Sequence, residues 1–319
     1  MSFSNDVKKE ICKNKIKNRI EALVELSSIV KTNASISIRN AFYNIVFTTE
    51  NEDISDRIYK LVKKVYDYDS KISYLENNQL QKNGIYLVTI EDEEVVLSLL
   101  KDSGLDLYGN YTVEEDILLS RLKSESENKR AAYIRGCFLG SGSIVDPNKS
   151  YHLEIIASKR EDVSLILKVF LSFNIEAKVT NRKDKFVIYI NEVEKISDFL
   201  NIVGANASML ELENITALKE LRNNINRQVN CDTANINKTV RAAQKQIEDI
   251  KYIDRYIGIK NLPKNLQEIA FLRVNHPESS LKELGEKLDP PLGKSGVSHR
   301  LKKIEAISDK HRKEKEKKI

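Results

Sequence analysis

The sequence predicts an α+β protein in which a duplicated α-β-β-α-β-β-α domain is followed by an all-α domain with a helix-turn-helix pattern. The duplication is predicted because residues 19–104 and 128–204 divide into the same order of helices and strands. Asn33 and Ser141, which close matching helices in the two copies, lie 108 positions apart, as an internal repeat requires. A capping box ahead of a basic helix near the C-terminus predicts the second domain.

The chain divides into three parts, with the duplicated domain expected over 1–208, a helical linker over 209–258, and the helix-turn-helix domain with its basic tail over 259–319. The 319 residues are 41% apolar, which is enough for a sizeable core. The three cysteines are far apart, so neither a disulfide framework nor a zinc site is expected. No apolar run reaches the length of a membrane span, and we expect a cytoplasmic protein.

The first copy is assigned from the spacing of its apolar residues. We expect, in order, a helix over 19–31, strands over 35–39 and 42–49 with Asn40 as the turn, a helix over 53–67, strands over 71–75 and 84–90 around an Asn-rich turn, and a helix over 93–100. The helix over 53–67 has the clearest pattern, because Ile54, Ile58 and Leu61 fall on one face.

The second copy repeats this order. We expect a helix over 131–141, a strand opening at Ser143, strands over 151–157, 175–180 and 185–190, and helices over 161–173 and 192–203, with Gly204 as the stop. The pair Glu52-Asp53 recurs 109 positions later as Glu161-Asp162, close to the spacing of Asn33 and Ser141. Two landmarks with the same spacing favour duplication over a chance similarity of order.

One short segment in each copy contains small residues on a helix face. Gly136 and Gly140 lie four apart, so they share a face onto which another backbone can approach closely. Leu26–Ala34 has the same design and is followed by the same Ser-Ile pair that follows Gly142. Written in register, Leu26–Ala34 and Ile134–Gly142 resemble the nine-residue LAGLIDADG motif of homing endonucleases. The resemblance implies two motif helices side by side at a pseudo-twofold axis, with DNA-binding strands beside them.

The resemblance also implies a catalytic acid at the eighth motif position, and here the sequence departs from the family. The eighth positions are Asn33 and Ser141, and neither is a carboxylate. Cleavage of a phosphodiester needs a divalent cation, and hard cations need charged oxygen ligands. Glu25 lies more than two helical turns before Asn33 and cannot replace it. We therefore expect a scaffold with no catalytic residues, no metal and no cofactor, while an active LAGLIDADG nuclease remains the alternative.

The predicted linker contains a polar segment dense in amides. The helix expected over 211–227 is followed by Asn226–Lys238, and a second helix is expected to end at Gly258. Asn and Arg at a helix start can hold phosphates, and Asn is also a common cap of an ordinary turn between helices. Both interpretations stay open, and the candidate DNA contacts here are Arg227, Asn230, Asn235 and Lys238.

The C-terminal segment reads as three helices. The first is expected over 262–274 and is broken by His276-Pro277, and the second opens at the capping box Ser280–Glu283. After the turn Asp289–Gly293, we expect Ser295 to cap a third helix with an apolar inner face. Small polar and basic side chains at the start of such a helix can read base edges in the major groove. The candidate DNA-binding residues are Lys294, Ser295, Ser298, His299, Arg300, Lys302 and Lys303.

A degenerate LAGLIDADG domain joined to a helix-turn-helix resembles the WhiA family of Gram-positive bacteria over nearly the full chain. The resemblance is strongest over Tyr133–Glu154, Asn226–Asn237 and Ser280–Leu301. It implies a sequence-specific transcription regulator in cell division, chromosome segregation or sporulation, which binds double-stranded DNA and is associated with the nucleoid. A protein-interaction scaffold that has left DNA behind is a further alternative, and the sequence identifies no protein partner.

Overall fold

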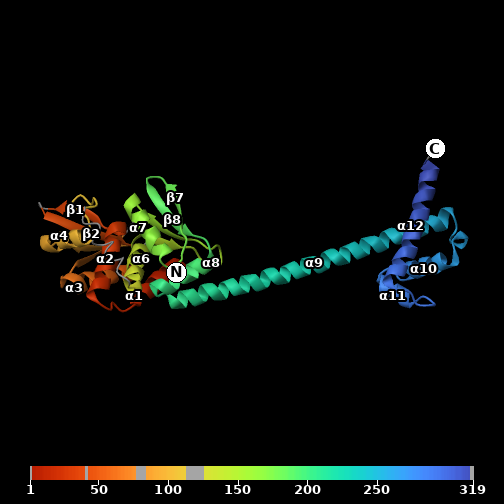
Figure 1. Ribbon diagram of the computed structural model, residues 1–319, viewed down its shortest axis with the longest axis horizontal. Helices are drawn as coiled ribbons and strands as arrows, with labels where there is room; N and C mark the ends of the chain where they lie inside the picture. The colour runs from red at the N-terminus through yellow and green to blue at the C-terminus, as the bar shows by residue number, and fades with distance from the viewer. Residues whose placement is uncertain (1, 40–41, 77–83, 113–125, 317–319) are drawn as a thin grey trace. The chain divides into compact units, whose positions relative to one another are not determined.

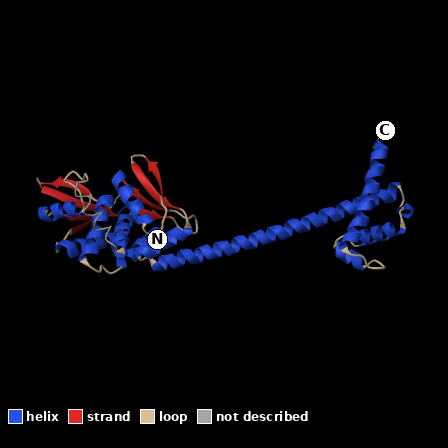
Figure 2. Cartoon of the chain, in the orientation of Figure 1, coloured by secondary structure: helices blue, strands red, loops and turns tan. Residues whose placement is uncertain are grey.

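The computed structural model describes residues 2–39, 42–76, 84–112 and 126–316. The contacts divide the chain into two compact units, Met1–Lys219 and Glu220–Ile319. The first unit contains two antiparallel sheets with helices, and the second is helical (Figures 1 and 2). The expected α+β class is therefore confirmed. No helix among the described residues is both long and apolar enough to span a membrane.

The first unit contains the predicted duplication. After α1 (Phe3–Lys13), the first repeat consists of α2 (Arg19–Asn33), β1 (Ser35–Arg39), β2 (Phe42–Thr49), α3 (Glu52–Tyr66), β3 (Lys71–Leu75), β4 (Ile85–Ile90) and α4 (Glu93–Asp102). The second repeat consists of α6 (Glu127–Ser141), β5 (Gly142–Ile144), β6 (Leu153–Ala157), α7 (Arg160–Leu171), β7 (Lys178–Arg182), β8 (Lys185–Ile190) and α8 (Val193–Val203). The two sheets have equivalent strand orders, β1-β2-β4-β3 and β5-β6-β8-β7.

The motif helices α2 and α6 lie side by side in the core of this unit (Figure 1). Nine consecutive residues of α2, Ala22–Val30, are buried, so this helix is covered on all sides. Asn18 caps the start of α2 by accepting a hydrogen bond from the Glu21 N–H. One apolar cluster includes side chains of both repeats, so they fold as one body around the helix pair.

One strand of this unit begins later than predicted, and two predicted turns fall on residues that are not described. The strand expected over 175–180 begins later, at Lys178, because the chain first closes α7 with a left-handed Asn174 (φ +57°). The N–H of Ile175 then donates to the Phe170 carbonyl, 3.0 Å away, and cannot join the sheet. The turns expected at Asn40 and in the Asn-rich segment before Gly84 lie outside the described residues, apart from Glu76 and Gly84 themselves.

The predicted break in the linker is wrong. One α-helix, α9 (Asn206–Tyr256), runs without interruption through 51 residues, including Asn226–Lys238. That segment is polar but has neither Gly nor Pro, so nothing in it removes a helical hydrogen bond or frees the backbone. After Gly258 come the short 3₁₀ turn η1 (Ile259–Asn261) and three helices, α10 (Lys264–Asn275), α11 (Leu281–Glu286) and α12 (Lys294–Glu316).

Candidate nucleic-acid interface

Helices α11 and α12 form the predicted helix-turn-helix around a small apolar core. Ser280 and Glu283 form the expected capping box at the start of α11. Gly285 then lets the turn fold back onto α11, since a Cβ at this position would overlap the carbonyl oxygen of Leu292. The N–H of Leu292 donates to the Gly285 carbonyl at 2.9 Å. Two backbone segments therefore touch at Gly285, and this contact sets where α12 begins.

The recognition helix α12 begins two residues earlier than expected, because a cap at Ser295 would make Gly296 the first helical residue. Lys294 is its first residue, so Ser295 lies inside the first turn and is not the cap. The Val297 N–H donates to the Gly293 carbonyl at 3.1 Å, which places the helix start at the glycine. The predicted inner face is confirmed, because Val297, Leu301 and Ile304 are buried against α10 and α11.

The candidate reading residues of α12 mostly face solvent. The exposed ones are Lys294, Ser295, His299, Lys302 and Lys303, and Ser298 is half-buried. Arg300 is different: its side chain is only 22% exposed, and its Nη1 lies 3.2 Å from the Asn265 carbonyl and 3.9 Å from Glu268 Oε2. The guanidinium therefore fastens α12 to α10, and Arg300 acts as a positioning residue.

The predicted basic tail is largely helical and is held by the end of α9. Contacts join Lys245 to Glu305, Asp249 to Ser308 and Arg312, Tyr252 to His311, and Tyr256 to Lys315. Partners are separated by a nearly constant 59 to 63 positions, so the two helical segments run parallel. Lys315 Nζ lies 4.1 Å from the centre of the Tyr256 ring. These contacts fix the second half of α12 to the end of α9, and we call them the anchor of α12. Because α12 is one continuous helix, the anchor also fixes the position of its first half.

Asp249 is the buried polar centre of this anchor. The Ser308 hydroxyl donates to its Oδ1 at 3.0 Å, and Arg312 Nη2 lies 2.9 Å from the same atom. Burial raises the pKa of Asp249, while the Ser308 hydrogen bond and the Arg312 charge oppose that rise. An acid that is nearly inaccessible to water therefore keeps two partners on α12.

The four candidate contacts of α9 lie in the middle of the continuous helix. Arg227, Asn230, Asn235 and Lys238 are all exposed. The proposal of a phosphate-binding helix start is wrong here, because their backbone N–H groups are used inside the helix. Arg227 and Lys238 are 11 positions apart, about three turns, so they lie on one face and could contact phosphates only through their side chains.

The two degenerate motif positions tie the helix ends to their own sheets. Asn33 Nδ2 donates to the carbonyls of Thr48 and Gly140 at 3.0 and 3.1 Å, and its Oδ1 accepts from the Thr48 N–H. The Ser141 hydroxyl donates to the Ile156 carbonyl at 2.6 Å. In each repeat, the bonded strand residue lies 15 positions after the motif residue. These polar atoms therefore join the end of each motif helix to a strand of its own repeat, and Asn33 also joins α2 to α6.

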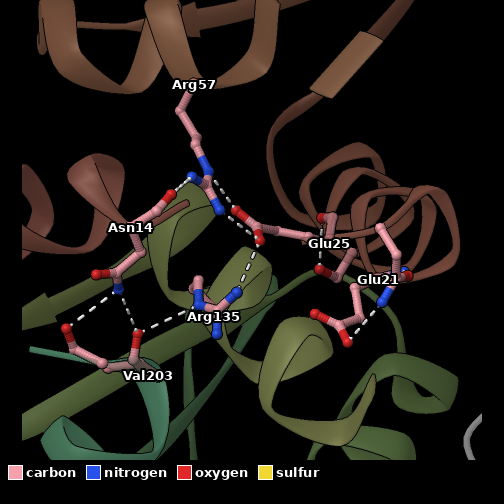
Figure 3. A network of polar contacts seen from close by, with 9 residues as sticks. Asn14, Glu21, Glu25, Arg57, Arg135 and Val203 are labelled. Atoms are coloured by element: carbon pink, nitrogen blue, oxygen red, sulfur yellow. Dashed lines mark hydrogen bonds and ion pairs between the residues drawn. The ribbon is translucent and has the colours of Figure 1, made fainter. Parts of the chain in front are cut away.

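Glu25, the carboxylate nearest the motif in α2, forms ion pairs with two arginines (Figure 3). Its oxygens lie 2.8 and 3.0 Å from the Arg57 guanidinium of α3, and 3.0 Å from Arg135 Nη1 of α6. Asn14 extends the network, since its carbonyl accepts from Arg57 and its amide donates to the Val203 carbonyl. Sequence reasoning missed this network, because its members lie 32 and 110 positions from Glu25.

The described residues contain no cluster of three or more His, Cys, Asp or Glu side chains able to hold a metal ion. Asn33 and Ser141 are neutral and already hydrogen-bonded, and Glu25 is neutralised by arginines. The chemistry that the described donor atoms could support at the helix ends is therefore hydrogen bonding.

Comparison with known proteins agrees with this arrangement. Residues 19–106 match the family described as the WhiA N-terminal LAGLIDADG-like domain, 130–222 the WhiA LAGLIDADG-like domain, and 225–308 the WhiA C-terminal HTH domain. The chain is 46% identical over 309 residues to a probable cell division protein WhiA of Clostridium botulinum, which covers 97% of this chain and 98% of the relative. It is 45% identical over 318 residues to the protein of the same name from Clostridium beijerinckii, covering 98% and 99%.

A crystal structure of full-length DUF199/WhiA from Thermatoga maritima is also similar, with a TM-score of 0.57 and 26% identity over 97% of this chain and 99% of that one. Fold and site together define the class as a helix-turn-helix protein that carries a LAGLIDADG-like domain with neutral residues at the motif's acidic positions. The matches extend over both units. The chain belongs to the WhiA family.

Proposed function

We propose that this protein is a sequence-specific, double-stranded-DNA-binding transcriptional regulator with a role in cell division or sporulation, acting on the chromosome in the cytoplasm. The observation that carries the proposal is the exposed polar and basic face at the start of α12, held rigid by α10, α11 and the end of α9. The cell-division role is supported by the names of the relatives alone.

The proposed reading mode follows from the order of residues on α12. Ser295, Ser298 and His299 are small or polar and lie in the first two turns, where a recognition helix meets base edges. Lys294, Lys302 and Lys303 supply charge to the flanking phosphates, which gives affinity and a strong dependence on salt. Arg227 and Lys238 of α9 are proposed as further phosphate contacts.

We further propose that the protein does not cut DNA. Hydrolysis would need charged metal ligands at the motif ends, and Asn33 and Ser141 supply neutral atoms that already have partners. The double variant Asn33→Asp/Ser141→Asp restores both acids with little change in size. Incubated with supercoiled DNA and Mg²⁺, the parent protein should leave the DNA intact, and cutting by the pure parent would refute the proposal. Cutting by the double variant alone would support the loss of acids as the cause.

The DNA-binding proposal is tested by mapping the bound sites of the full chain and measuring its affinity for them. Ser298→Ala should relax the sequence preference, while Lys302→Ala should weaken binding to all sequences alike. A base contact should contribute about 1–3 kcal/mol. The matched control is Lys310→Ala, which removes an exposed lysine of the same helix far from its N-terminal turns. If Ser298→Ala and Lys302→Ala both bound target DNA with the affinity and sequence preference of the parent, as the control Lys310→Ala is expected to do, the proposed interface would be refuted.

A further inference from the structure

The middle of α9 is exposed on every side. Every residue from Glu220 to Ala242 is exposed, in a helix that continues without a break at both ends of this segment. A helix that runs through solvent is usually polar all round, since exposed apolar patches mark sites of interaction. This helix is not polar all round, so its exposed apolar residues require an explanation.

Large apolar residues recur along α9 in steps of three, four or seven positions. They are Leu218, Leu221, Ile225, Val229, Ile236 and Val240, and each is 47–62% exposed. At 3.6 residues per turn these positions fall on one side of the helix, and we call them the α9 stripe. A row of exposed large apolar residues on one side of a helix is typical of an interface between chains.

Two charged residues lie within the α9 stripe, and they identify the partner. Arg222 and Asp232 occupy the same side as Ile225 and Val229. If two copies of α9 paired in parallel, Arg222 would face Arg222 and Asp232 would face Asp232, which is repulsive. If the copies pair antiparallel about position 227, each Arg222 faces Asp232 of the other copy, and the seam gains two ion pairs of opposite sign.

The same antiparallel register also pairs four of the six residues of the α9 stripe with one another, while Leu221 falls opposite Thr233 and Val240 opposite Asn214. It places Ile225 opposite Val229, and Leu218 opposite Ile236, twice in each pair of helices. We infer that the α9 stripe binds a second copy of this chain through antiparallel pairing of α9 centred at Arg227. The inference goes beyond the proposed function and does not depend on it, since it rests on the apolar and charged residues of one helix face.

The pairing leaves the opposite face of α9 in solvent. Arg227 lies two positions before Val229, and Lys238 two positions after Ile236, which turns both side chains about 200° away from the stripe. The proposed phosphate contacts therefore stay accessible in the paired state. A dimer also carries two helix-turn-helix motifs, the arrangement by which such proteins bind two half-sites.

Sedimentation equilibrium of the full chain without DNA tests the pairing. At micromolar concentration the expected mass is twice that of the 36.6 kDa chain. Val229→Glu places a charge in the seam twice and should raise the dissociation constant about 100-fold or more. The matched control Asn223→Glu adds the same charge one turn before Arg227, on the face away from the stripe, and should leave the dimer unchanged. Circular dichroism of both variants checks that the helix content is kept.

Charge reversal tests the direction of pairing. Arg222→Asp alone and Asp232→Arg alone should each weaken the dimer, while the double variant Arg222→Asp/Asp232→Arg should restore it, because the opposite charges again face each other. A parent chain that is monomeric at micromolar concentration overturns the inference, and so does a folded Val229→Glu variant that dimerises like the parent. Failure of the double variant to recover overturns the antiparallel register.

Discussion

The two motif helices have the same place in their repeats but different side chains at equivalent positions. In α2, Glu25 binds two arginines, whereas the residue 108 positions later in α6 is Tyr133, which is fully buried and shares a hydrogen bond with Cys137. One repeat therefore brings a charge to the centre of the domain, and the other brings an aromatic ring. The two repeats share one backbone arrangement, but only the first has a charged side chain at this position of its motif helix.

The same asymmetry appears where the helices touch. Gly136 faces Ser28 and Gly140 faces Thr32, and each pair is separated by the repeat distance of 108 positions. A residue of one helix therefore meets its own counterpart, as a twofold axis requires. At each contact, α2 supplies a hydroxyl side chain and α6 supplies the space for it. The helix pair is therefore held by complementary residues and not by identical ones.

Removal of the central charge should have the largest effect. Glu25→Ala leaves Arg57, which is 2% exposed, and Arg135 without their shared carboxylate. Breaking a buried ion pair in this way costs about 3–5 kcal/mol. Urea unfolding of the full chain, followed by circular dichroism, should show this loss in the transition of the first unit.

An apolar replacement of the whole network separates charge from packing. The triple variant Glu25→Leu/Arg57→Met/Arg135→Met removes every member of the cluster and should recover much of the stability, since no charge is left unpaired. Tyr133→Phe, at the equivalent position of α6, should lose about 1 kcal/mol. If Glu25→Ala were no worse than Tyr133→Phe, the one-sided charge would not be a main support of the domain.

Changes at the helix contact should have an intermediate effect. A Cβ at Gly140 would come closer than 3.0 Å to the Thr32 hydroxyl, so Gly140→Val should destabilise the first unit by about 1–3 kcal/mol through overpacking. The reciprocal variant Gly140→Ser/Thr32→Gly should recover stability, because it moves the side chain to the other helix. Thermal unfolding measures both variants.

Gly136 offers a contrasting contact that sharpens this test. A Cβ there would overlap the backbone carbonyl of Glu25 as well as the Ser28 hydroxyl. Gly136→Ala should therefore stay destabilised when combined with Ser28→Gly, because the carbonyl cannot be removed. Equal recovery at both positions would indicate that the helices can separate, and that small residues are not required at their contact.

A smaller difference is expected between the two degenerate motif positions. Asn33 makes three hydrogen bonds to backbone groups of Thr48 and Gly140, whereas the short bond of Ser141 goes to one carbonyl. Asn33→Ala should cost about 2 kcal/mol and Ser141→Ala about 1 kcal/mol. Hydrogen exchange of the Thr48 N–H, which bonds to Asn33 Oδ1, should accelerate in Asn33→Ala alone. If Ser141→Ala lost more stability than Asn33→Ala, the number of hydrogen bonds at each motif position would not determine its contribution to stability.

The smallest expected effect is a dependence on pH that belongs to the second repeat. Burial raises the pKa of Asp162, although its hydrogen bond from the Tyr111 hydroxyl opposes the rise. The folded state therefore holds the proton more tightly than the unfolded state. The contribution of Asp162 to the free energy of unfolding should therefore fall as pH rises from the unfolded pKa of about 3.8 through the higher folded value.

Two variants test this dependence by urea unfolding at a series of pH values. Asp162→Asn should remove the contribution to the slope. Tyr111→Phe should make the slope steeper, because it removes a hydrogen bond to the charged form. A slope that is unchanged in Asp162→Asn would assign the pH dependence to another group.

The sequence predicted the elements of the duplicated domain well, because helices such as 53–67 bury one face and their apolar spacing is visible. It failed at α9, where repeated Asn residues suggested a cap although no Gly or Pro breaks the helix. The capping box and inner face of α12 were also predictable from local spacing. The partners of Arg300 and Asp249 were not, since they lie 32 to 63 positions away and only the folded chain brings them together.

The anchor between α9 and the second half of α12 has a thermodynamic consequence for recognition. A helix that DNA must first order loses conformational entropy on binding, and that loss is subtracted from its affinity. Here Asp249, Tyr252 and Tyr256 hold α12 before any ligand arrives. Calorimetry of Asp249→Ala should therefore report weaker binding through a less favourable entropy, even though the partners of this residue lie in the second half of α12 and not in its first two turns.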